Sequence, residues 1–398
     1  MSVGFPKPDY DSDVRQAYKG GFTYLHSPYK EKDIGEGLVM DVNSLYPWVM
    51  HDCPLPYGEP VFFKGEYQYD KYYPLYVQMI TCQFELKPGY IPTIQDKSGF
   101  NGFSPTEYLI DSGDREVTMC LTSVDLELFK EHYEIYNPVY HSGWKFRSTV
   151  GLFTDYIDKW MQVKIESTKN GNKAMRTLSK LMLNALYGKF GSKIEVGSKY
   201  PEYDNGKIVY KTPKDEFGKP VKDRREPVYI PVATFVTAWA RHKTITSAQK
   251  MYKYFVYADT DSLHLRMDLP DEVRKMSNDE LEQLTTEDLR KLGLEFPEDF
   301  VIDPVALGAW KLESKFTRAR FLRQKSYIED SNPCDVWESE NYNKNLLKIT
   351  CAGMPKSCYD QVDWDNFKVN SSFEGKLVPK HVNGGIVLVD TIFTIKPT

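Results

Sequence analysis

A chain of 398 residues is long enough for about two or three domains and a large buried core. Its composition, 41% hydrophobic and 27% charged, is typical of a folded globular protein and excludes a wholly disordered one. The net charge of −5 argues at first against a nucleic-acid-binding protein.

The sequence predicts neither a membrane protein nor a secreted one. Its apolar runs fall short of the roughly 20 residues that span a bilayer, and the N-terminus has no basic start followed by an apolar core. The cysteines are scattered without a CxxC pair, so we expect reduced thiols and no zinc site. They are Cys53, Cys82, Cys120, Cys334, Cys351 and Cys358.

The charge is unevenly distributed along the chain. Residues 268–303 contain twelve acidic and four basic side chains, so the rest of the chain is net positive. Basic residues are concentrated in 159–193 and 311–327. A charge run is usually a solvated face, but two basic runs beside the motifs described below favour a track for phosphates.

The first clear elements lie near the N-terminus. Residues 38–42 form a short apolar run that predicts a buried strand, followed by a helix after Asn43 and Ser44. Residues 53–150 mix short strands with Pro- and Gly-rich turns and have the character of an insertion.

Two helices should follow. The first contains Phe153 and Lys164 at helical spacing, with Ser148 or Thr149 as its N-cap. The second covers 174–190, with one apolar stripe and one polar face. The stripe consists of Leu178, Leu181, Met182 and Ala185, and the polar face of Arg176, Lys180, Asn184 and Tyr187.

The C-terminal half continues with a polar stretch over 192–231, which predicts a long exposed hairpin or loop, and a helix over 234–253. Residues 254–267 read as a hairpin whose polar turn carries two acids. The 268–303 stretch predicts an acidic surface helix or pair of helices, and the tail from Gly384 ends in strands.

Carboxylates at strand ends are the residues that carry chemistry. Asp41 and Asp261 come from distant parts of the chain, and hard oxygen ligands of this kind hold Mg²⁺. An Asp at one strand end is commonly only a turn former. Three such acids, with Asp259 as the third and a basic helix between them in sequence, favour a two-metal site for phosphoryl transfer.

These segments resemble known motifs in the right order. Motifs A, B and C of family B DNA polymerases are similar to Asp41-Val-Asn-Ser-Leu-Tyr-Pro47, Lys180-Leu-Met-Leu-Asn-Ala-Leu-Tyr-Gly188 and Tyr257-Ala-Asp-Thr-Asp-Ser262. The family's other motifs resemble Tyr18-Lys-Gly-Gly21, Thr237-Ala-Trp-Ala-Arg241 and Lys325-Ser-Tyr327. The resemblance covers nearly the whole chain and is nearest to the protein-primed, phi-twenty-nine-type branch of small tailed phages.

The resemblance implies roles for individual residues. Asp41, the Val42 carbonyl and Asp261 should bind two Mg²⁺ ions, which Mn²⁺ can replace, with Asp259 in support and Lys180 as the catalytic cation. Tyr46 should exclude a 2′-hydroxyl. The incoming dNTP should be bound by Tyr46, Lys164, Lys180, Asn184, Tyr187 and Gly188. Primer or template should be held by Ser44, Lys189, Thr237, Arg241, Lys325 and Tyr327.

It also implies an α+β right-hand polymerase fold with two inserted subdomains. The palm would begin in 1–52 and resume in 232–333, with the acidic insertion at 268–303. The fingers would be 151–191 and the thumb 334–398. The insertion at 53–150 resembles the region that docks the priming protein, and 192–231 resembles the loop for processivity and strand displacement.

The implied partners are primer–template DNA, dNTPs and a terminal protein, and the implied state is a monomer in the cytoplasm of an infected bacterium. Only 17 residues precede Tyr18, so we expect no proofreading exonuclease within this chain. The acidic stretch is longer than the family suggests, and we interpret it as a solvated insertion that repels stray DNA.

Two other functions compete with this prediction. A reverse transcriptase or RNA polymerase also uses palm carboxylates, but Tyr46 as a sugar gate and the Asp-Thr-Asp-Ser turn disfavour both. A catalytically silent DNA-binding or priming accessory would keep the fold and lose the acids. All three acids and Lys180 are present.

Overall fold

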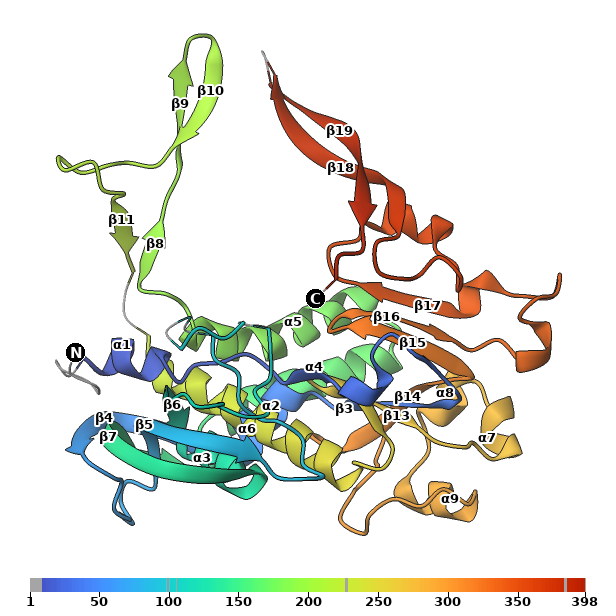
Figure 1. Ribbon diagram of the computed structural model, residues 1–398, viewed down its shortest axis with the longest axis horizontal. Coiled ribbons are helices and arrows are strands. Elements are labelled where there is room, and N and C mark those ends of the chain that lie inside the picture. The colour runs from blue at the N-terminus through green and yellow to red at the C-terminus, as the bar shows by residue number, and fades with distance from the viewer. Residues whose placement is uncertain are drawn as a thin grey trace. The chain divides into compact units, whose positions relative to one another are not determined.

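A computed structural model describes residues 9–97, 99, 101–104, 106–225, 228–382 and 385–397. The chain is a mixture of α and β and divides into two compact units (Figure 1). The first contains residues 1–26, 36–192 and 229–315, and the second contains 27–35, 193–228 and 316–398. Among the described residues, no helix has the length and apolarity needed to cross a membrane.

A five-stranded sheet forms the centre of the first unit, in the order β1-β12-β13-β3-β14. Its strands are β1 (Thr23–Leu25), β3 (Gly37–Val42), β12 (Phe255–Asp259), β13 (Ser262–Arg266) and β14 (Trp310–Phe316). Strand β3 is buried at Leu38, Val39 and Met40, as expected for an apolar run with both faces covered. The predicted strand at 38–42 and the hairpin at 254–267 are both confirmed.

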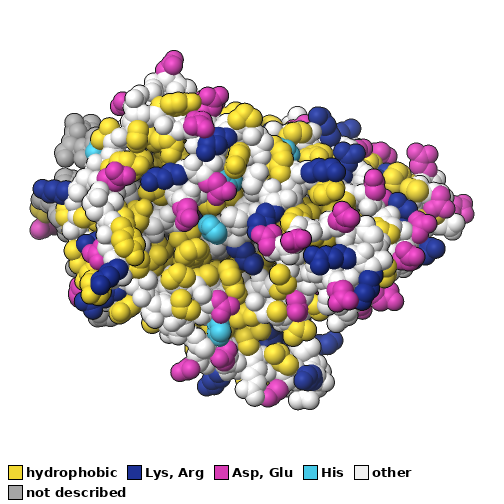
Figure 2. All heavy atoms as spheres, turned by 90° about the horizontal axis from the view of Figure 1, so that it is seen from below, with side chains coloured by type: hydrophobic (Ala, Val, Ile, Leu, Met, Phe, Trp, Pro, Cys, Tyr) yellow, Lys and Arg dark blue, Asp and Glu magenta, His cyan; other side chains and the backbone are white. Residues whose placement is uncertain are grey.

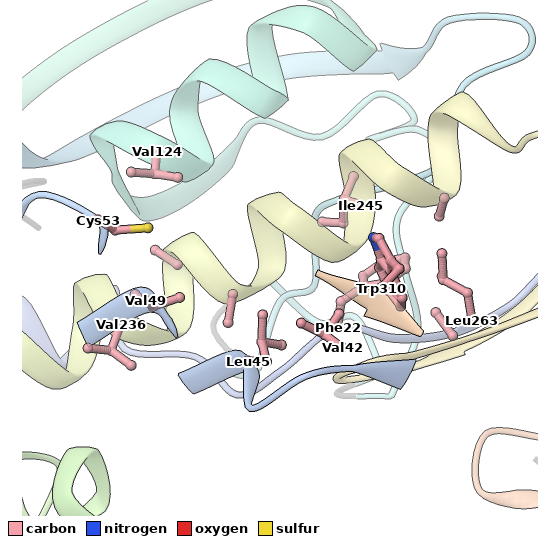
Figure 3. Packing of buried hydrophobic residues seen from close by; sticks show 14 of the residues in the cluster. Phe22, Val42, Leu45, Val49, Cys53, Val124, Val236, Ile245, Leu263 and Trp310 are labelled. Carbon is pink, nitrogen blue, oxygen red and sulfur yellow. The ribbon is translucent and has the colours of Figure 1, made fainter. Parts of the chain in front are cut away.

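Helix α6 (Ile230–Lys250) packs its side chains into the core together with α2 (Leu45–Asp52). Figure 3 shows both ends of this contact, with Val236 of α6 near Val49 of α2 and Ile245 of α6 near Trp310. The helix predicted over 234–253 therefore exists, but it begins at Ile230 because the apolar run extends in that direction.

A second sheet in the same unit has the order β4-β7-β5-β6 and packs against α3 (Ser123–His132). Its strands are β4 (Leu55–Lys64), β5 (Leu75–Leu86), β6 (Val117–Thr122) and β7 (Tyr133–Thr149). The prediction of short strands over 53–150 was wrong for β5 and β7, which are 12 and 17 residues long. Each pairs with two neighbours, which sustains its length.

Helices α4 (Thr154–Lys169) and α5 (Lys173–Phe190) lie side by side (Figure 1). Ser148 and Thr149 do not cap α4, because both belong to β7; the helix follows Phe153 without a side-chain cap. The expected apolar stripe of α5 is also wrong. Leu178 and Leu181 are 43% and 62% exposed, and the buried residues are Ser179 and Leu183.

The acidic 268–303 stretch forms three short helices, α7 (Asp271–Lys275), α8 (Asn278–Leu281) and α9 (Thr286–Lys291). The expectation of one or two surface helices was incomplete. Leu281, Leu289 and Phe300 are buried in the main core, so this stretch is an anchored part of the unit. The remaining helix of the unit is α1 (Tyr10–Arg15).

The second unit contains a four-stranded sheet in the order β17-β16-β15-β2 and separate two-stranded ribbons. The sheet consists of β2 (Asp33–Ile34), β15 (Arg318–Arg323), β16 (Ser326–Asp330) and β17 (Leu347–Cys351). The ribbons pair β8 (Glu195–Gly197) with β11 (Lys222–Arg224), β9 (Tyr200–Asp204) with β10 (Lys207–Lys211), and β18 (Ser372–Val382) with β19 (Gly385–Thr394).

The single long hairpin or loop predicted over 192–231 is instead two ribbons, β8–β11 and β9–β10, whereas the strands predicted at the C-terminus are confirmed. Gly384 itself lies outside the described residues. The short 3₁₀ helices are Ser27–Tyr29, Cys334–Val336, Lys344–Leu346 and Lys356–Gln361. All six cysteines are free thiols, as predicted.

Candidate active site

A pocket of about 320 Å³ lies in the first unit. It is formed by the end of β3, the start of α2, one side of α4 and α5, the β12–β13 turn and β14. Its lining residues are Asp41, Val42, Asn43, Ser44, Leu45, Tyr46, Lys164, Arg176, Lys180, Leu183, Asn184, Tyr187, Asp261 and Lys311. The pocket therefore brings together residues from three motifs that are far apart in sequence.

The two predicted metal-binding acids meet in this pocket. Strands β3 and β13 pair so that Asp41 is opposite Ser262, and the amide of Val42 donates to the Asp261 carbonyl at 2.8 Å. Burial raises the pKa of Asp41 to about 7, with Asp261 and then Glu313 adding to the effect. Burial likewise raises the pKa of Asp261, and the Asp259 carboxylate contributes. The pocket therefore disfavours the ionised forms of Asp41 and Asp261 when no cation lies beside them.

This donor set fits a divalent cation. Among the described residues there is no group of three His, Cys, Asp or Glu side chains able to hold a metal, so Asp41 and Asp261 would bind as a pair. Mg²⁺ suits such a pair, because it keeps several waters and substrate phosphate oxygens as ligands. Two desolvated carboxylates whose ionised forms are disfavoured are stabilised by a cation between them.

The turn that carries Asp261 is held from outside the hairpin. Thr260 has φ +61°, a left-handed conformation, and its amide donates to the Phe22 carbonyl at 2.6 Å. Its carbonyl accepts from the Thr244 hydroxyl of α6 at 2.6 Å. A Cβ on Gly21 would lie 2.7 Å from Thr260 Cγ2, so only glycine permits this approach.

Asp259 is directed toward β1. Its Oδ1 accepts from the Thr23 hydroxyl at 3.1 Å, and its Oδ2 accepts from the Tyr257 hydroxyl at 3.3 Å. It is not among the pocket-lining residues. This arrangement suits the supporting role predicted for it, which stays a prediction.

Positive side chains also line the pocket. Lys164 Nζ donates to the Ser44 hydroxyl at 3.1 Å, and burial lowers the pKa of Lys164, with Lys180, Arg176 and Lys311 adding to the shift. Several cations so close together repel one another unless an anion is present. The pocket is therefore suited to a polyanionic ligand such as a triphosphate.

Tyr46 and Tyr187 are stacked, with ring centroids 4.1 Å apart and an interplanar angle of 27°. Burial and the neighbouring Tyr187 raise the pKa of Tyr46, so its hydroxyl stays protonated. Asn184 lies on the same side of α5 and lines the pocket. Gly188 is exposed with no atom within 4 Å of an added Cβ, so nothing packs against it.

Thr237 and Arg241 were expected to contact primer or template, but both are buried in α6, at 2% and 5% exposure. Arg241 pairs with Asp125 of α3 at 2.7 Å and donates to the carbonyls of Lys19 and Gly20. Their direct role in DNA binding stays a prediction. Arg241 instead supports the segment that packs on the Thr260 turn.

Three of the other four predicted DNA-binding residues are not among the residues that line the pocket. Ser44 lines it, whereas Lys189 is exposed near the end of α5. Lys325 and Tyr327 belong to the second unit, where Tyr327 is buried and stacked on Phe321 with ring centroids 4.9 Å apart. Their roles in DNA binding stay predictions.

Sequence reasoning missed several residues that the structure implicates. Arg176 appeared only as part of a helix face, and Lys311 only as part of a basic run, yet both line the pocket. Asp125 and Thr244 carried no motif. Their contacts depend on residues more than ten positions away, so only a three-dimensional arrangement could reveal them.

Comparison with known proteins supports the same family. The family model described as "DNA polymerase type B, organellar and viral" matches residues 3–279. The chain belongs to the type B DNA polymerase family. It is 45% identical to the DNA polymerase of Bacillus phage Nf over 403 residues and 44% identical to that of Bacillus phage phi29 over 394 residues. These alignments cover 98% and 97% of the chain but only 64% and 62% of the relatives.

Solved structures of this polymerase family agree. Phi29 DNA polymerase, in a complex with primer–template DNA and incoming nucleotide, matches with a TM-score of 0.81 and 43% identity. That match covers 98% of the chain and 64% of the phi29 polymerase. The chain therefore spans less than two thirds of the length of the polymerases it matches.

Several basic side chains lie together at the pocket, whereas one face of the molecule carries basic and acidic side chains mixed together. Figure 2 shows a face on which Lys and Arg side chains are interspersed with Asp and Glu, so no field of one sign covers it. That face thus differs from the pocket, where Lys164, Arg176, Lys180 and Lys311 lie together.

Proposed function

We propose that this chain is a template-directed DNA polymerase that adds dNTPs to a primer hydroxyl by two-metal phosphoryl transfer, in a protein-primed and strand-displacing mode. The observation that carries the proposal is the pocket itself. It combines the paired carboxylates Asp41 and Asp261 with a group of cations and a stacked pair of tyrosines. Those are the parts that binding and activating a nucleoside triphosphate requires.

In the proposed mechanism, Asp41, Asp261 and the Val42 carbonyl hold divalent cations. When bound, these ions lower the pKa of the attacking hydroxyl and stabilise the pyrophosphate leaving group. Lys164 and Lys180 bind the triphosphate and stabilise negative charge that develops on it. Tyr46 and Tyr187 form the wall beside the sugar and base, and Tyr46 rejects a 2′-hydroxyl.

The finer architecture belongs to the same proposal. The central sheet would be the palm, α4 and α5 the fingers, and residues 334–398 the thumb of a right-hand fold. The subdomain over 53–150 would dock a terminal protein, whose hydroxyl replaces the primer hydroxyl at initiation. The ribbons within 192–231 would support processivity and strand displacement.

The test is extension of a labelled DNA primer–template by the purified chain with Mg²⁺ and dNTPs. Asp261→Ala should abolish extension, because one carboxylate cannot hold the ions in place. Glu287→Gln, an exposed change on α9 remote from the pocket residues, should leave it intact. Replacing dNTPs by rNTPs, and DNA templates by RNA, would distinguish a reverse transcriptase or RNA polymerase.

The assay is repeated with Mn²⁺ and with a terminal protein, so that a missing component is not mistaken for inactivity. Tight binding of primer–template without extension under all of these conditions would refute the enzymatic proposal and favour the accessory.

A further inference from the structure

Lys311 is a pocket residue that none of the recognised motifs includes. It lies on β14, next to the strand that carries Asp41, and its side chain is 23% exposed. Among the positive charges that lower the pKa of Asp41, Lys311 acts more strongly than Lys180. Its ammonium group is therefore a significant part of the electrostatics of the pocket.

The partner of Lys311 comes from the acidic stretch. Its Nζ lies 3.5 Å from Oε2 of Glu282, the residue that follows α8. Neighbouring Leu281 is fully buried, and a capping box formed by Ser277 and Glu280 fixes the start of α8. Glu282 is thus presented to Lys311 by an anchored helix.

Further contacts fix the acidic stretch against β14. The Lys315 ammonium donates to the Met276 carbonyl, and the Asp303 amide donates to the Trp310 carbonyl at 2.9 Å. Contacts therefore lie on both sides of Lys311 along the strand. The acidic stretch, whose composition predicts a solvated insertion, contributes a specific counter-ion beside the pocket.

The Lys311–Glu282 ion pair is weak enough for a ligand anion to replace Glu282. Its 3.5 Å separation is long for a charge-assisted hydrogen bond, and the Glu282 side chain is 39% exposed to water. Such pairs are weak, because solvent screens them. A phosphate oxygen in the more buried pocket is screened less by solvent than the Glu282 carboxylate, and would therefore compete successfully for the ammonium group.

We propose that Lys311 is an additional phosphate-binding cation of the pocket, and that Glu282 of the acidic stretch holds its ammonium group until phosphate binds. This inference rests on the proposed function, since it names a further residue for the same site. The phosphate belongs either to the triphosphate of the incoming nucleotide or to the terminal diester of the primer. Both present the same chemistry to Lys311.

The test compares Lys311→Gln, Glu282→Gln and the double variant in two equilibrium titrations. One measures dNTP binding to a complex with a dideoxy-terminated primer–template, and the other measures primer–template binding alone. Lys311→Gln should raise the dissociation constant of one ligand by about ten- to hundredfold, the loss of one hydrogen bond to a charged group. Lys311→Arg should retain most of the affinity.

Glu282→Gln should lower the same dissociation constant by about twofold, because a weak competing ion pair is removed. In the Lys311→Gln background that change should have no effect. Glu287→Gln and Lys291→Gln remove the same charges from an exposed pair on α9 and should change neither titration. Thermal unfolding of every variant would identify any that fail to fold.

A raised constant for dNTP identifies the triphosphate as the partner of Lys311, and a raised constant for primer–template identifies the diester. Unchanged constants for Lys311→Gln in both titrations would overturn the inference, as would a Glu282→Gln effect that persists without Lys311. Wild-type primer extension is measured in parallel. Extension with unchanged titrations refutes this inference alone, whereas no extension refutes the proposed function and this inference with it.

Discussion

Helices α5 and α6 both carry residues of polymerase motifs, yet they present them in opposite ways. In α6, fifteen of 21 residues are buried, including Thr237 and Arg241. In α5, only Ser179 and Leu183 of 18 residues are buried, and Lys180 is exposed to the pocket. The structure thus gives the α6 motif residues buried contacts within the protein and leaves those of α5 accessible to a ligand.

The largest effect should come from the buried ion pair between Arg241 of α6 and Asp125 of α3. Burial alone would raise the pKa of Asp125, but the Arg241 guanidinium outweighs it and holds that pKa below its usual range. Arg241→Ala would leave Asp125 charged and unpaired, at a cost of about 3–5 kcal/mol in the free energy of unfolding. Urea denaturation measures this loss.

The double variant Asp125→Leu/Arg241→Met should recover part of that stability, because it removes both members of the buried ion pair together. A loss of less than about 1 kcal/mol in Arg241→Ala would contradict the structural role and restore a direct role in DNA binding.

Gly21→Ala tests whether the segment held by Arg241 supports the turn that carries Asp261. The new methyl group would lie 2.7 Å from Thr260 Cγ2, so the turn must shift. Overpacking of this kind costs about 1–3 kcal/mol and should displace Asp261, lowering kcat more than it raises KM for dNTP. Gly20→Ala, where no atom lies within 4 Å, is the matched control. Equal kinetics for the two variants would contradict the proposed support.

Lys180→Ala tests the opposite behaviour of α5. Removing one cation from the pocket should raise KM for dNTP about tenfold and lower kcat. The free energy of unfolding should change by less than about 0.5 kcal/mol, because the side chain is exposed. Steady-state kinetics and urea denaturation measure the two quantities. Wild-type kinetics would show that α5 does not meet the triphosphate.

The smallest effect should come from a surface contact between α2 and α4. The Asp52 carboxylate raises the pKa of His51, Asp158 adds to the shift, and His51 Nε2 lies 3.2 Å from Asp158 Oδ1. Because the folded pKa is raised, this contribution is complete below the unfolded pKa of about 6.5 and is lost as pH rises through the folded value.

His51→Gln should therefore lower Tm on the order of 1 °C at pH 5.5 and have less effect at pH 8.5. Differential scanning calorimetry at both pH values measures the difference. A deficit that grows with pH would reverse the assigned sign and exclude the ion pair as its source.

The sequence by itself determined the local elements and the residue types of the site. The apolar run before Asp41, the hairpin around Asp261 and the face of Lys180, Asn184 and Tyr187 are all properties of neighbouring residues, and each was confirmed as structure. Periodicity and turn chemistry act over a few residues, so these features are readable without a fold.

Only the tertiary structure decided which side of each element is buried and what it touches. Leu178 and Leu181 look like a core stripe but stay exposed, whereas Arg241 looks like a DNA contact but is buried against Asp125. The Lys311–Glu282 pair likewise joins a strand to a helix outside every motif. Burial depends on which segments, distant in sequence, pack against one another, and a local sequence pattern does not determine that packing.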